Sequence, residues 1–331
     1  MMIDAMGSFS LNDGRSIPKI GLGTFGSDRY NGEQIADAVR FAGKIGFRHF
    51  DCAAVYGNEK EVGKAINDLI QSGVPRSDLW ITGKVWNNRH HDAHQACLDS
   101  LADLNLDYFD LYLIHWPFPN HHDPGCDVGS RSASAKPFIV EDYLSTWRQL
   151  ETLKSQGYAK SIGTSNMTVA KFEAFLPHVS VIPAANEMEL HPHFQQPEFF
   201  DYLASHQIQP IGFSPLGSPS RPERDRTDED SSPLDDLVIL DLAKIYQSTP
   251  AQICIKWAIQ RGQVTIPFST KEHQIKQILD AVAIPDFTPA ELDKIANIDR
   301  NCRLIKGQVF LWRDDQSWED LWDLDGRTAQ R

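Results

Sequence analysis

Eight short runs rich in β-forming residues recur along this chain of 331 residues, and stretches with helical periodicity separate them. The runs cover residues 19–23, 48–52, 79–85, 109–115, 159–164, 181–187, 209–214 and 264–269. Most are almost continuously apolar, which is typical of parallel strands buried on both faces. Eight strand–helix units of this kind predict an α/β fold, a (β/α)8 barrel of the TIM type, that forms one domain over residues 1–331.

The helices between these runs are indicated by apolar residues spaced three and four apart. Four apolar stripes, centred near Val39, Ala65, Leu101 and Leu150, follow the first four runs. Later helices are expected over residues 168–176, 198–205, 234–246, 251–260 and 272–281. The alternation of strands and helices continues without a change in composition that would indicate a linker.

A doubly wound dinucleotide-binding sheet with a second domain is the alternative fold. Gly21, Gly23 and Gly26 have the glycine spacing of the G-x-G-x-x-G motif that follows the first strand of such a sheet. A single match of this kind is weak evidence, and the acidic residue expected about 20 residues later at the end of a second strand is missing. We therefore favour the barrel.

Three segments are longer than ordinary connections: residues 116–140, 215–233 and 301–331. The first two follow strand carboxyl ends, which form the active-site face of a barrel. A disordered insertion is the alternative for residues 219–232. The tail, 301–331, contains Trp312, Trp318 and Trp322, and so much aromatic surface is costly to leave in water. We expect this tail to cover the mouth of the barrel.

The composition excludes several classes of protein. A net charge of −13 opposes a broad nucleic-acid interface. The chain has no apolar run of about 18 to 20 residues, as a membrane span needs, and residues 1–10 do not resemble a secretory signal. Five cysteines in so long a chain suit a reducing compartment. We therefore expect a cytoplasmic protein with neither a nucleic-acid nor a membrane partner.

Ionisable side chains occur at the ends of three successive predicted strands. Asp51, Lys84 and His115 end the second, third and fourth runs, and Tyr56 follows Asp51 by five residues. A lysine in an apolar run needs a partner, and Asp51 is the nearest one. A cation beside Tyr56 is expected to lower the pKa of the phenol, so that Tyr56 could act as a general acid or base. His115 could donate a hydrogen bond to a carbonyl oxygen.

These groups suit proton transfer to a carbonyl, and the hydride must then come from a cofactor because no side chain supplies one. The structural alternative is a buried Asp51–Lys84 ion pair beside a core histidine. We assign no metal site. His191 and His193 lie in a loop beyond the sixth strand, and the pairs at 90–91 and 121–122 lie at a helix start and in a polar loop.

Five motifs in the chain resemble those of the aldo-keto reductases, over about residues 11–301. They are GLGTF at 21–25, RHFDCAAVYGNE at 48–59, LIHWP at 113–117, SIGTSN at 161–166 and FSPLG at 213–217. The resemblance implies a catalytic tetrad of Asp51, Tyr56, Lys84 and His115. Tyr56 would donate the proton in reduction, assisted by Lys84, which Asp51 holds, and His115 would align the substrate carbonyl.

The resemblance also implies the cofactor and substrate contacts. Those expected for NAD(P)(H) are Gly23, Thr24, Phe25, Asp51, Ser165, Asn166, Glu187, Phe213, Ser214, Leu216, Ser218, Phe268, Ser269, Thr270, Gln274, Gln277 and Ile278. Phe213 would stack on the nicotinamide, and Ser214, Leu216 and Ser218 would line the pyrophosphate. Phe25, Trp86 and Trp116 would form the substrate pocket, with core packing as the alternative for the two tryptophans.

The chain departs from the family pattern at four of these positions. Glu187 stands where glutamine is usual, and Ile278 replaces the asparagine expected at the adenine. Phe268 and Gln274 replace the lysine and arginine that hold the 2′-phosphate of NADP. The loss of two cations favours NAD(H). Lys271 or the arginines at 221, 224 and 226 could compensate.

The sequence therefore predicts a reductase of aldehydes, ketones or sugars that acts reversibly on a small carbonyl substrate. A monomer is expected, with a dimer as the alternative. Two other functions stay open: a nicotinamide-binding regulatory subunit with little catalysis, and a metal-dependent hydrolase.

Overall fold

Eight parallel strands form the central sheet of the protein, in a computed structural model that describes residues 6–26, 29–119, 135–219, 221 and 226–328. The strands are β3 (Leu22–Gly23), β4 (His49–Asp51), β5 (Trp80–Val85), β6 (Phe109–Ile114), β7 (Ala159–Ser165), β8 (Ala185–Glu189), β9 (Gln209–Phe213) and β10 (Val264–Thr265). Their spatial order follows the chain from β3 to β10. A doubly wound sheet would reverse direction partway, so this order excludes the alternative fold.

The sheet closes on itself between its first and last strands. Ile20, just before β3, forms a parallel bridge with Thr265 of β10. The amide of Gly21 donates to the carbonyl of Thr265 at 2.9 Å, and the amide of Thr265 donates to the carbonyl of Lys19 at 3.0 Å. The closed parallel sheet with its outer helices confirms the predicted (β/α)8 barrel.

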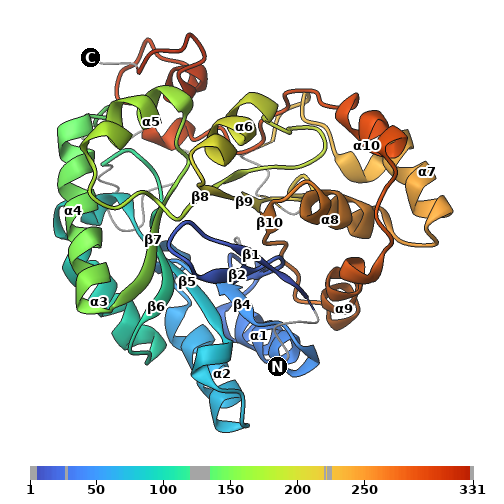
Figure 1. Cartoon of the computed structure of the whole chain (residues 1–331), viewed down its shortest axis with the longest axis horizontal. Coiled ribbons are helices and arrows are strands. Elements are labelled where there is room, and N and C mark those ends of the chain that lie inside the picture. Colours follow the sequence, from blue (N-terminus) through green and yellow to red (C-terminus); the bar gives the residue numbers. More distant parts are fainter. Residues whose placement is uncertain (1–5, 27–28, 120–134, 220, 222–225, 329–331) are drawn as a thin grey trace.

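Helices surround the sheet, as Figure 1 shows. They are α1 (Gly32–Ile45), α2 (Glu59–Gln71), α3 (Ala93–Leu104), α4 (Val140–Gln156), α5 (Val169–Phe175), α6 (Pro197–Ser205), α7 (Leu237–Ile245), α8 (Pro250–Gln260), α9 (Glu272–Asp280) and α10 (Pro289–Ala296). The main apolar core lies between them and the strands. Within the described part of the chain, no helix is long and apolar enough to cross a membrane.

A hairpin that the sequence did not predict precedes the barrel. Strands β1 (Ser8–Ser10) and β2 (Ser16–Pro18) pair antiparallel and lie across the centre of the view in Figure 1. Leu11 and Ile17 of this hairpin belong to the same buried cluster as Leu111 and Val264 of the barrel strands. The hairpin thus packs against the interior of the barrel.

Prolines explain where two strands differ from their predicted limits. The sixth was expected at 181–187 but runs from Ala185 to Glu189, after Pro183. The eighth was expected to reach residue 269 but ends at Thr265, before Pro267. A proline has no amide hydrogen for the ladder, so regular pairing stops beside it.

The C-terminal tail docks on the barrel through polar as well as aromatic groups. The buried ammonium of Lys171 on α5 forms an ion pair with Asp323 and donates to the carbonyl of Leu321 at 2.8 Å. Asp323 also accepts a hydrogen bond from Thr168, the residue that caps α5. Trp322 stacks under Arg303, whose guanidinium carbon lies 3.4 Å from the ring centroid. The tail is therefore held at a defined position.

The contact between α2 and α3 makes a stability prediction. A Cβ added to Gly63 would lie 2.5 Å from the carbonyl oxygen of Leu104 and 2.6 Å from its Cα, both backbone atoms. We expect Gly63→Ala to lower the free energy of unfolding by roughly 1–3 kcal/mol, because the backbone cannot move away cheaply. Chemical denaturation measures this, with Lys64→Ala on the exposed side of α2 as the control. A Gly63→Ala variant as stable as the control would contradict this view of the helix contact.

Candidate active site

The sheet register brings three predicted side chains to one end of the barrel. Asp51 pairs with Thr82, and Lys84 lies two residues beyond Thr82 on the same strand. Lys84 in turn pairs with Leu113, and His115 lies two residues beyond Leu113. Because side chains alternate along a strand, Asp51, Lys84 and His115 therefore point into the same space.

Tyr56 joins this group from a short 3-10 helix, η3 (Ala54–Tyr56), which follows β4. Its hydroxyl lies 3.3 Å from the Nζ atom of Lys84. Lys84 Nζ also donates to Asp51 Oδ2 at 2.5 Å, and its side chain is fully buried. The ring of His115 meets the Tyr56 ring edge-on, with 5.8 Å between centroids. Contacts of Lys84 with Asp51 and Tyr56, and of Tyr56 with His115, thus link the four members of the predicted tetrad.

A second carboxylate, Glu187 on β8, faces the same lysine. Its Oε1 atom lies 3.4 Å from Lys84 Nζ, and the side chain is 3% exposed. The sequence predicted Glu187 only as a cofactor contact, so its ion pair with Lys84 is a new feature of the site. The cation of Lys84 therefore stands between two buried carboxyl groups.

Burial dominates the acid–base properties of these groups. It lowers the pKa of Lys84, but the neighbouring carboxyl groups, Asp51 first among them, outweigh it and raise the pKa well above its ordinary value. Burial raises the pKa of Asp51, against the opposing effect of Lys84. Burial and the charge of Lys84 hold the pKa of His115 well below its ordinary value, so the imidazole is neutral at neutral pH.

The prediction that a nearby cation would lower the pKa of Tyr56 is wrong in its net direction. The charge of Lys84 does lower the pKa of Tyr56, but burial of the phenol raises it by more. The charges of Asp51 and Glu187 add to the rise. Tyr56 is therefore a protonated phenol at neutral pH, which can donate a proton but is a poor base until its surroundings change.

Three predicted cofactor contacts lie together beside the tetrad. Ser165 of β7 pairs with Glu187 of β8, and Asn166 follows directly with a left-handed backbone, φ 57°. The Asn166 amide donates to the backbone carbonyl of His115 at 3.0 Å, which fixes its orientation. Two buried acceptors, Asn166 Oδ1 and Glu187 Oε2, have no donor within the described residues. The unpartnered amide oxygen of Asn166 fits a donor such as the NH2 group of a nicotinamide carboxamide.

The predicted pocket aromatics also touch the tetrad. Phe25, which is 52% exposed, lies 5.1 Å from Tyr56 between ring centroids, and Trp86 lies 5.1 Å from His115. Trp116 is more buried, at 7% exposure, and packs on Phe310 of the tail at 4.5 Å. Phe310 also contacts Trp86 at 6.0 Å. Trp116 therefore contributes to tail packing as well as to the pocket wall.

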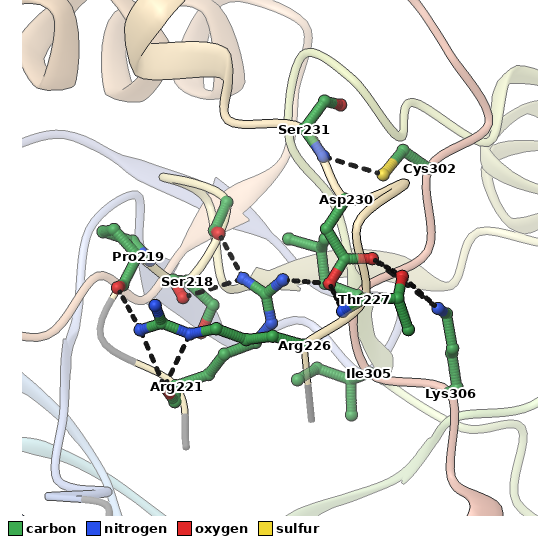
Figure 2. A network of polar contacts seen from close by, with 12 residues as sticks. Ser218, Pro219, Arg221, Arg226, Thr227, Asp230, Ser231, Cys302, Ile305 and Lys306 are labelled. Atoms are coloured by element: carbon green, nitrogen blue, oxygen red, sulfur yellow. Dashed lines mark hydrogen bonds and ion pairs between the residues drawn. The ribbon is translucent and has the colours of Figure 1, made fainter. Parts of the chain in front are cut away.

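The loop after β9 holds itself together with the arginines considered for phosphate binding. Figure 2 shows Arg221 paired with Asp230, and Arg226 donating to the carbonyl of Pro219 at 2.9 Å. Lys306 of the tail lies 3.6 Å from Asp230, which joins this loop to the tail. Residue 224 and most of the predicted segment 116–140 lie outside the described residues.

The turn before this loop supplies the predicted pyrophosphate contacts. Phe213 ends β9, and the Ser214 hydroxyl lies 3.3 Å from that of Ser218. Ser214 and Ser218 both have left-handed backbones, and Leu216 packs against the core beside them. The turn therefore keeps two hydroxyl groups close together at the end of β9.

The segment after β10 has no cation at the two positions predicted for a 2′-phosphate. Phe268 packs edge-on against Tyr30, 5.8 Å between centroids, and the Ser269 hydroxyl donates to Gln274 Oε1 at 2.6 Å. Thr270 is partly buried and Gln277 accepts through its carbonyl from Gln252 at 3.1 Å.

Three further predicted contacts lie deeper in the fold. Ile278 is 4% exposed and belongs to the main core, so it packs among apolar neighbours. Gly23 and Thr24 lie beside Asp51, and the Thr24 hydroxyl donates to the Asp51 carbonyl at 2.8 Å.

Asn58 and Phe310 are residues at this site that the sequence analysis missed. The Asn58 side chain is buried and donates to the carbonyl of Thr24 at 2.8 Å, which ties the segment carrying Tyr56 to the end of β3. Its place within the RHFDCAAVYGNE motif was the available signal. Phe310 had none, because its neighbours come from segments distant in sequence.

The histidine pairs do not assemble a metal centre in the described part of the chain, where no group of three potential ligands occurs. His191 bonds to Glu189 at 3.0 Å, and His193 bonds to Asp236 at 3.1 Å. The pair at 121–122 lies outside the described residues. His191 and His193 thus both help to hold the loop after β8.

With the barrel and its polar mouth established, similarity to known proteins defines the class. The family model described as "Aldo/keto reductase family" matches residues 19–300. The chain therefore belongs to the aldo/keto reductase family, as the resemblance of its motifs implied. Members of this family are NAD(P)H-dependent oxidoreductases that act on small carbonyl compounds, and this is the class of activity that the family supports for the chain.

Individual relatives match over nearly their whole length. The chain is 38% identical to aldo/keto reductase slr0942 of Synechocystis, covering 97% of this chain and 98% of the relative. It is 37% identical to aldo-keto reductase family 1 member A1-A of Danio rerio, covering 93% and 95%. Identity to the human family 1 member A1 is 36%, covering 89% and 90%.

A buried carboxyl group beside the site makes a pH-dependent prediction. Burial raises the pKa of Glu59 on α2 from 4.5 to about 7. Between these values the folded chain keeps a proton that the unfolded chain has lost, so stability falls as pH rises and the full penalty is present above pH 7. Glu59→Gln should remove this penalty. We expect the free energy of unfolding of the variant, relative to that of the wild type, to be up to roughly 3 kcal/mol higher at pH 8.5 than at pH 4.5.

Denaturant unfolding of both proteins at the two pH values measures this difference. Glu61→Gln, on the same helix turn and partly exposed, is the control. If Glu59→Gln changes the free energy of unfolding by the same amount at low and at high pH, Glu59 is not held neutral in the folded protein.

Proposed function

We propose that this chain reduces an aldehyde, ketone or sugar carbonyl to the alcohol, with a nicotinamide cofactor as the source of hydride and Tyr56 as the proton donor. The observation that carries the proposal is the contact of the Tyr56 hydroxyl with the buried, Asp51-paired ammonium of Lys84, 3.3 Å away. A structural ion pair alone has no need of a phenol at the same cation. The reaction is reversible in principle, because in the opposite direction the Tyr56 phenolate can take the proton back from the alcohol.

The chain's own residues give a simple sequence of events. His115, neutral and in edge contact with Tyr56, donates a hydrogen bond to the substrate oxygen and brings it next to the phenol. The bound reduced cofactor supplies the hydride. As negative charge develops on the substrate oxygen, Tyr56 gives up its proton, and Lys84 stabilises the phenolate that remains. Asp51 keeps Lys84 charged and in position.

The cofactor would be held along the carboxyl ends of the later strands. Ser165, Asn166 and Glu187 would bind the carboxamide, whose NH2 group would find a buried acceptor in Asn166 Oδ1. Phe213 would stack on the ring, and Ser214, Leu216 and Ser218 would line the pyrophosphate. Gly23, Thr24 and Phe25 would close the opposite side. Ser269, Thr270 and Gln277 would border the adenosine half.

We further propose that the chain favours NAD(H) over NADP(H). Phe268 packs on Tyr30, and Gln274 accepts a bond from Ser269, so neither offers a cation to a 2′-phosphate. Arg221 and Arg226 bond within their own loop, and Lys271 is exposed. The nearby Ile278 offers no polar group to the adenine.

The tail would complete the site. Phe310 touches both Trp86 and Trp116, so we propose that residues 301–331 cover the mouth of the barrel and shape the substrate pocket together with Phe25. We propose a single-domain, cytoplasmic, monomeric enzyme. Its partners would be small carbonyl compounds.

The test of the proton donor is Tyr56→Phe. We expect this variant to lose at least a hundredfold in kcat, because its phenyl ring has no proton to give, while its affinity for the reduced cofactor stays within about twofold. Steady-state turnover of small aldehydes and sugars, followed by cofactor absorbance, measures the first, and fluorescence titration the second. Tyr112→Phe, a buried hydroxyl deletion on β6, should leave both unchanged. If Tyr56→Phe keeps the kcat of the wild type, the phenol is not the proton donor. If the wild type binds the cofactor but turns over no substrate, a regulatory subunit is favoured instead.

Cofactor preference is tested by comparing kcat/KM for NADH and NADPH on one substrate. We expect NADH to be at least as good, and the double variant Phe268→Lys, Gln274→Arg to gain roughly tenfold or more for NADPH, because each restored charge-assisted bond is worth roughly 1.5–3 kcal/mol. The exposed pair Lys244→Gln, Lys276→Gln controls for general charge effects. A hundredfold advantage for NADPH in the wild type would refute this preference.

A further inference from the structure

The mouth of the barrel contains two buried carboxyl groups around one ammonium. Lys84 Nζ lies 2.5 Å from Asp51 Oδ2 and 3.4 Å from Glu187 Oε1, and none of these side chains is more than 3% exposed. Tyr56 and His115, which also face the trio, are neutral, as are the buried Cys52 thiol and His49 imidazole. Glu59 on α2, whose pKa burial raises to about 7, is the remaining acidic group that interacts with Lys84. With both carboxyls ionised, the cluster would carry a net charge of −1 away from water, which is costly. One carboxyl group therefore holds a proton.

The hydrogen bonds of Lys84 identify which carboxyl group that is. The ammonium has three hydrogens, and its acceptors are Asp51 Oδ2, the carbonyl of Cys52 at 3.3 Å and the Tyr56 hydroxyl. Glu187 Oε1 lies 3.4 Å from the same Nζ, farther than Asp51 Oδ2, so Glu187 is the weaker of the two carboxyl partners of Lys84. Of the two carboxyl groups, the one that Lys84 stabilises less as an anion keeps its proton. That group is Glu187.

The unpaired oxygen atoms agree with this assignment. Asp51 Oδ1 and Glu187 Oε2 are both buried and have no donor within the described residues. A proton on Glu187 provides the donor that two carboxylates cannot give each other. Burial raises the pKa of Glu187, and the charge of Asp51 and its hydrogen bond with Glu187 raise it further, against the opposing effect of Lys84.

Glu187 also borders the place assigned above to the nicotinamide. It pairs with Ser165 across the β7–β8 ladder, and its backbone carbonyl accepts from the amide of Asn166 at 2.8 Å. The oxidised nicotinamide ring carries a positive charge and the reduced ring carries none. A second cation at this point would compensate the charge that an ionised Glu187 brings.

We propose that Glu187 couples protonation to the oxidation state of the bound cofactor. It is a neutral carboxylic acid in the free protein, and it loses its proton to solvent when an oxidised nicotinamide cofactor binds but keeps it when the reduced form binds. The proposal rests on the proposed function, which puts the nicotinamide beside Ser165 and Asn166. By linkage, raising the pH through the neutral range tightens binding of the oxidised cofactor relative to the reduced one.

The experiment measures protons released on binding. Isothermal titration calorimetry with NAD+ and with NADH, at pH 7 in two buffers of different ionisation enthalpy, gives the number for each. The two ligands have the same phosphates, so their difference reports the ring charge. We expect about one proton released with NAD+ and about none with NADH, and a Kd for NAD+ that falls several-fold from pH 6 to pH 8. Equal proton counts for the two ligands would overturn the proposal.

Variants assign the proton to a residue. Glu187→Gln should bind NADH, which shows that it folds, and should release no proton with NAD+. Glu59→Gln removes another buried carboxyl group with a raised pKa, outside the trio, and should release the same proton as the wild type. If Glu187→Gln still releases it, or Glu59→Gln does not, Glu187 is not its source.

The same titrations separate this proposal from the proposed function. If neither NAD+ and NADH nor NADP+ and NADPH bind, the proposed function fails, and the coupling fails with it. If NADP+ and NADPH bind instead, they are compared in the same way, since that pair also differs only in the ring. Binding of both members of a pair without a difference in proton release overturns the coupling alone.

Discussion

The buried ammonium of Lys84 is the constraint on which the rest of the site depends. A fully buried lysine is stable only when it is paired, and here Asp51, Glu187 and Tyr56 all face it. These partners come from separate segments, so the cation fixes how β4, β5 and β8 meet at the mouth of the barrel. Removing one partner of such a pair typically costs about 3–5 kcal/mol, because the other charge stays behind without compensation. The geometry of the proposed proton donor and the stability of the barrel mouth thus depend on the same interaction.

The sequence sufficed for the architecture because the signals were local and repeated. Continuous apolar runs indicated parallel strands, and Lys84 in such a run demanded an acidic partner, which Asp51 provides. The closed sheet and the family match over residues 19–300 confirm the barrel and the family. The strand limits were less predictable where Pro183 and Pro267 remove ladder donors. The β1–β2 hairpin was missed because its strands are only three residues long.

The parts of the site that were not predictable depend on burial and on distant contacts. The charge of Lys84 near Tyr56 could be inferred from spacing, but the depth of the phenol could not, and depth decides the net direction of its pKa. In the same way, Glu187 could be named from a motif position, whereas its approach to Lys84 depends on how the assembled barrel brings β8 near β5. Phe310 reaches Trp116 in a tail that Lys171 and Asp323, among other contacts, anchor to the barrel. Such facts belong to the assembled fold, and no short segment encodes them.

Burial gives the site a consistent chemical character. It raises the pKa values of Tyr56 and Glu187 and lowers that of His115, so three titratable groups around Lys84 are neutral at neutral pH. Two of the three, Tyr56 and Glu187, then hold acidic protons beside a single fixed cation. A site in this state is ready to give a proton to an oxygen that gains negative charge, which is the need of carbonyl reduction. For the reverse reaction Tyr56 must first lose its proton, and the charge of Lys84 beside the phenol favours that loss.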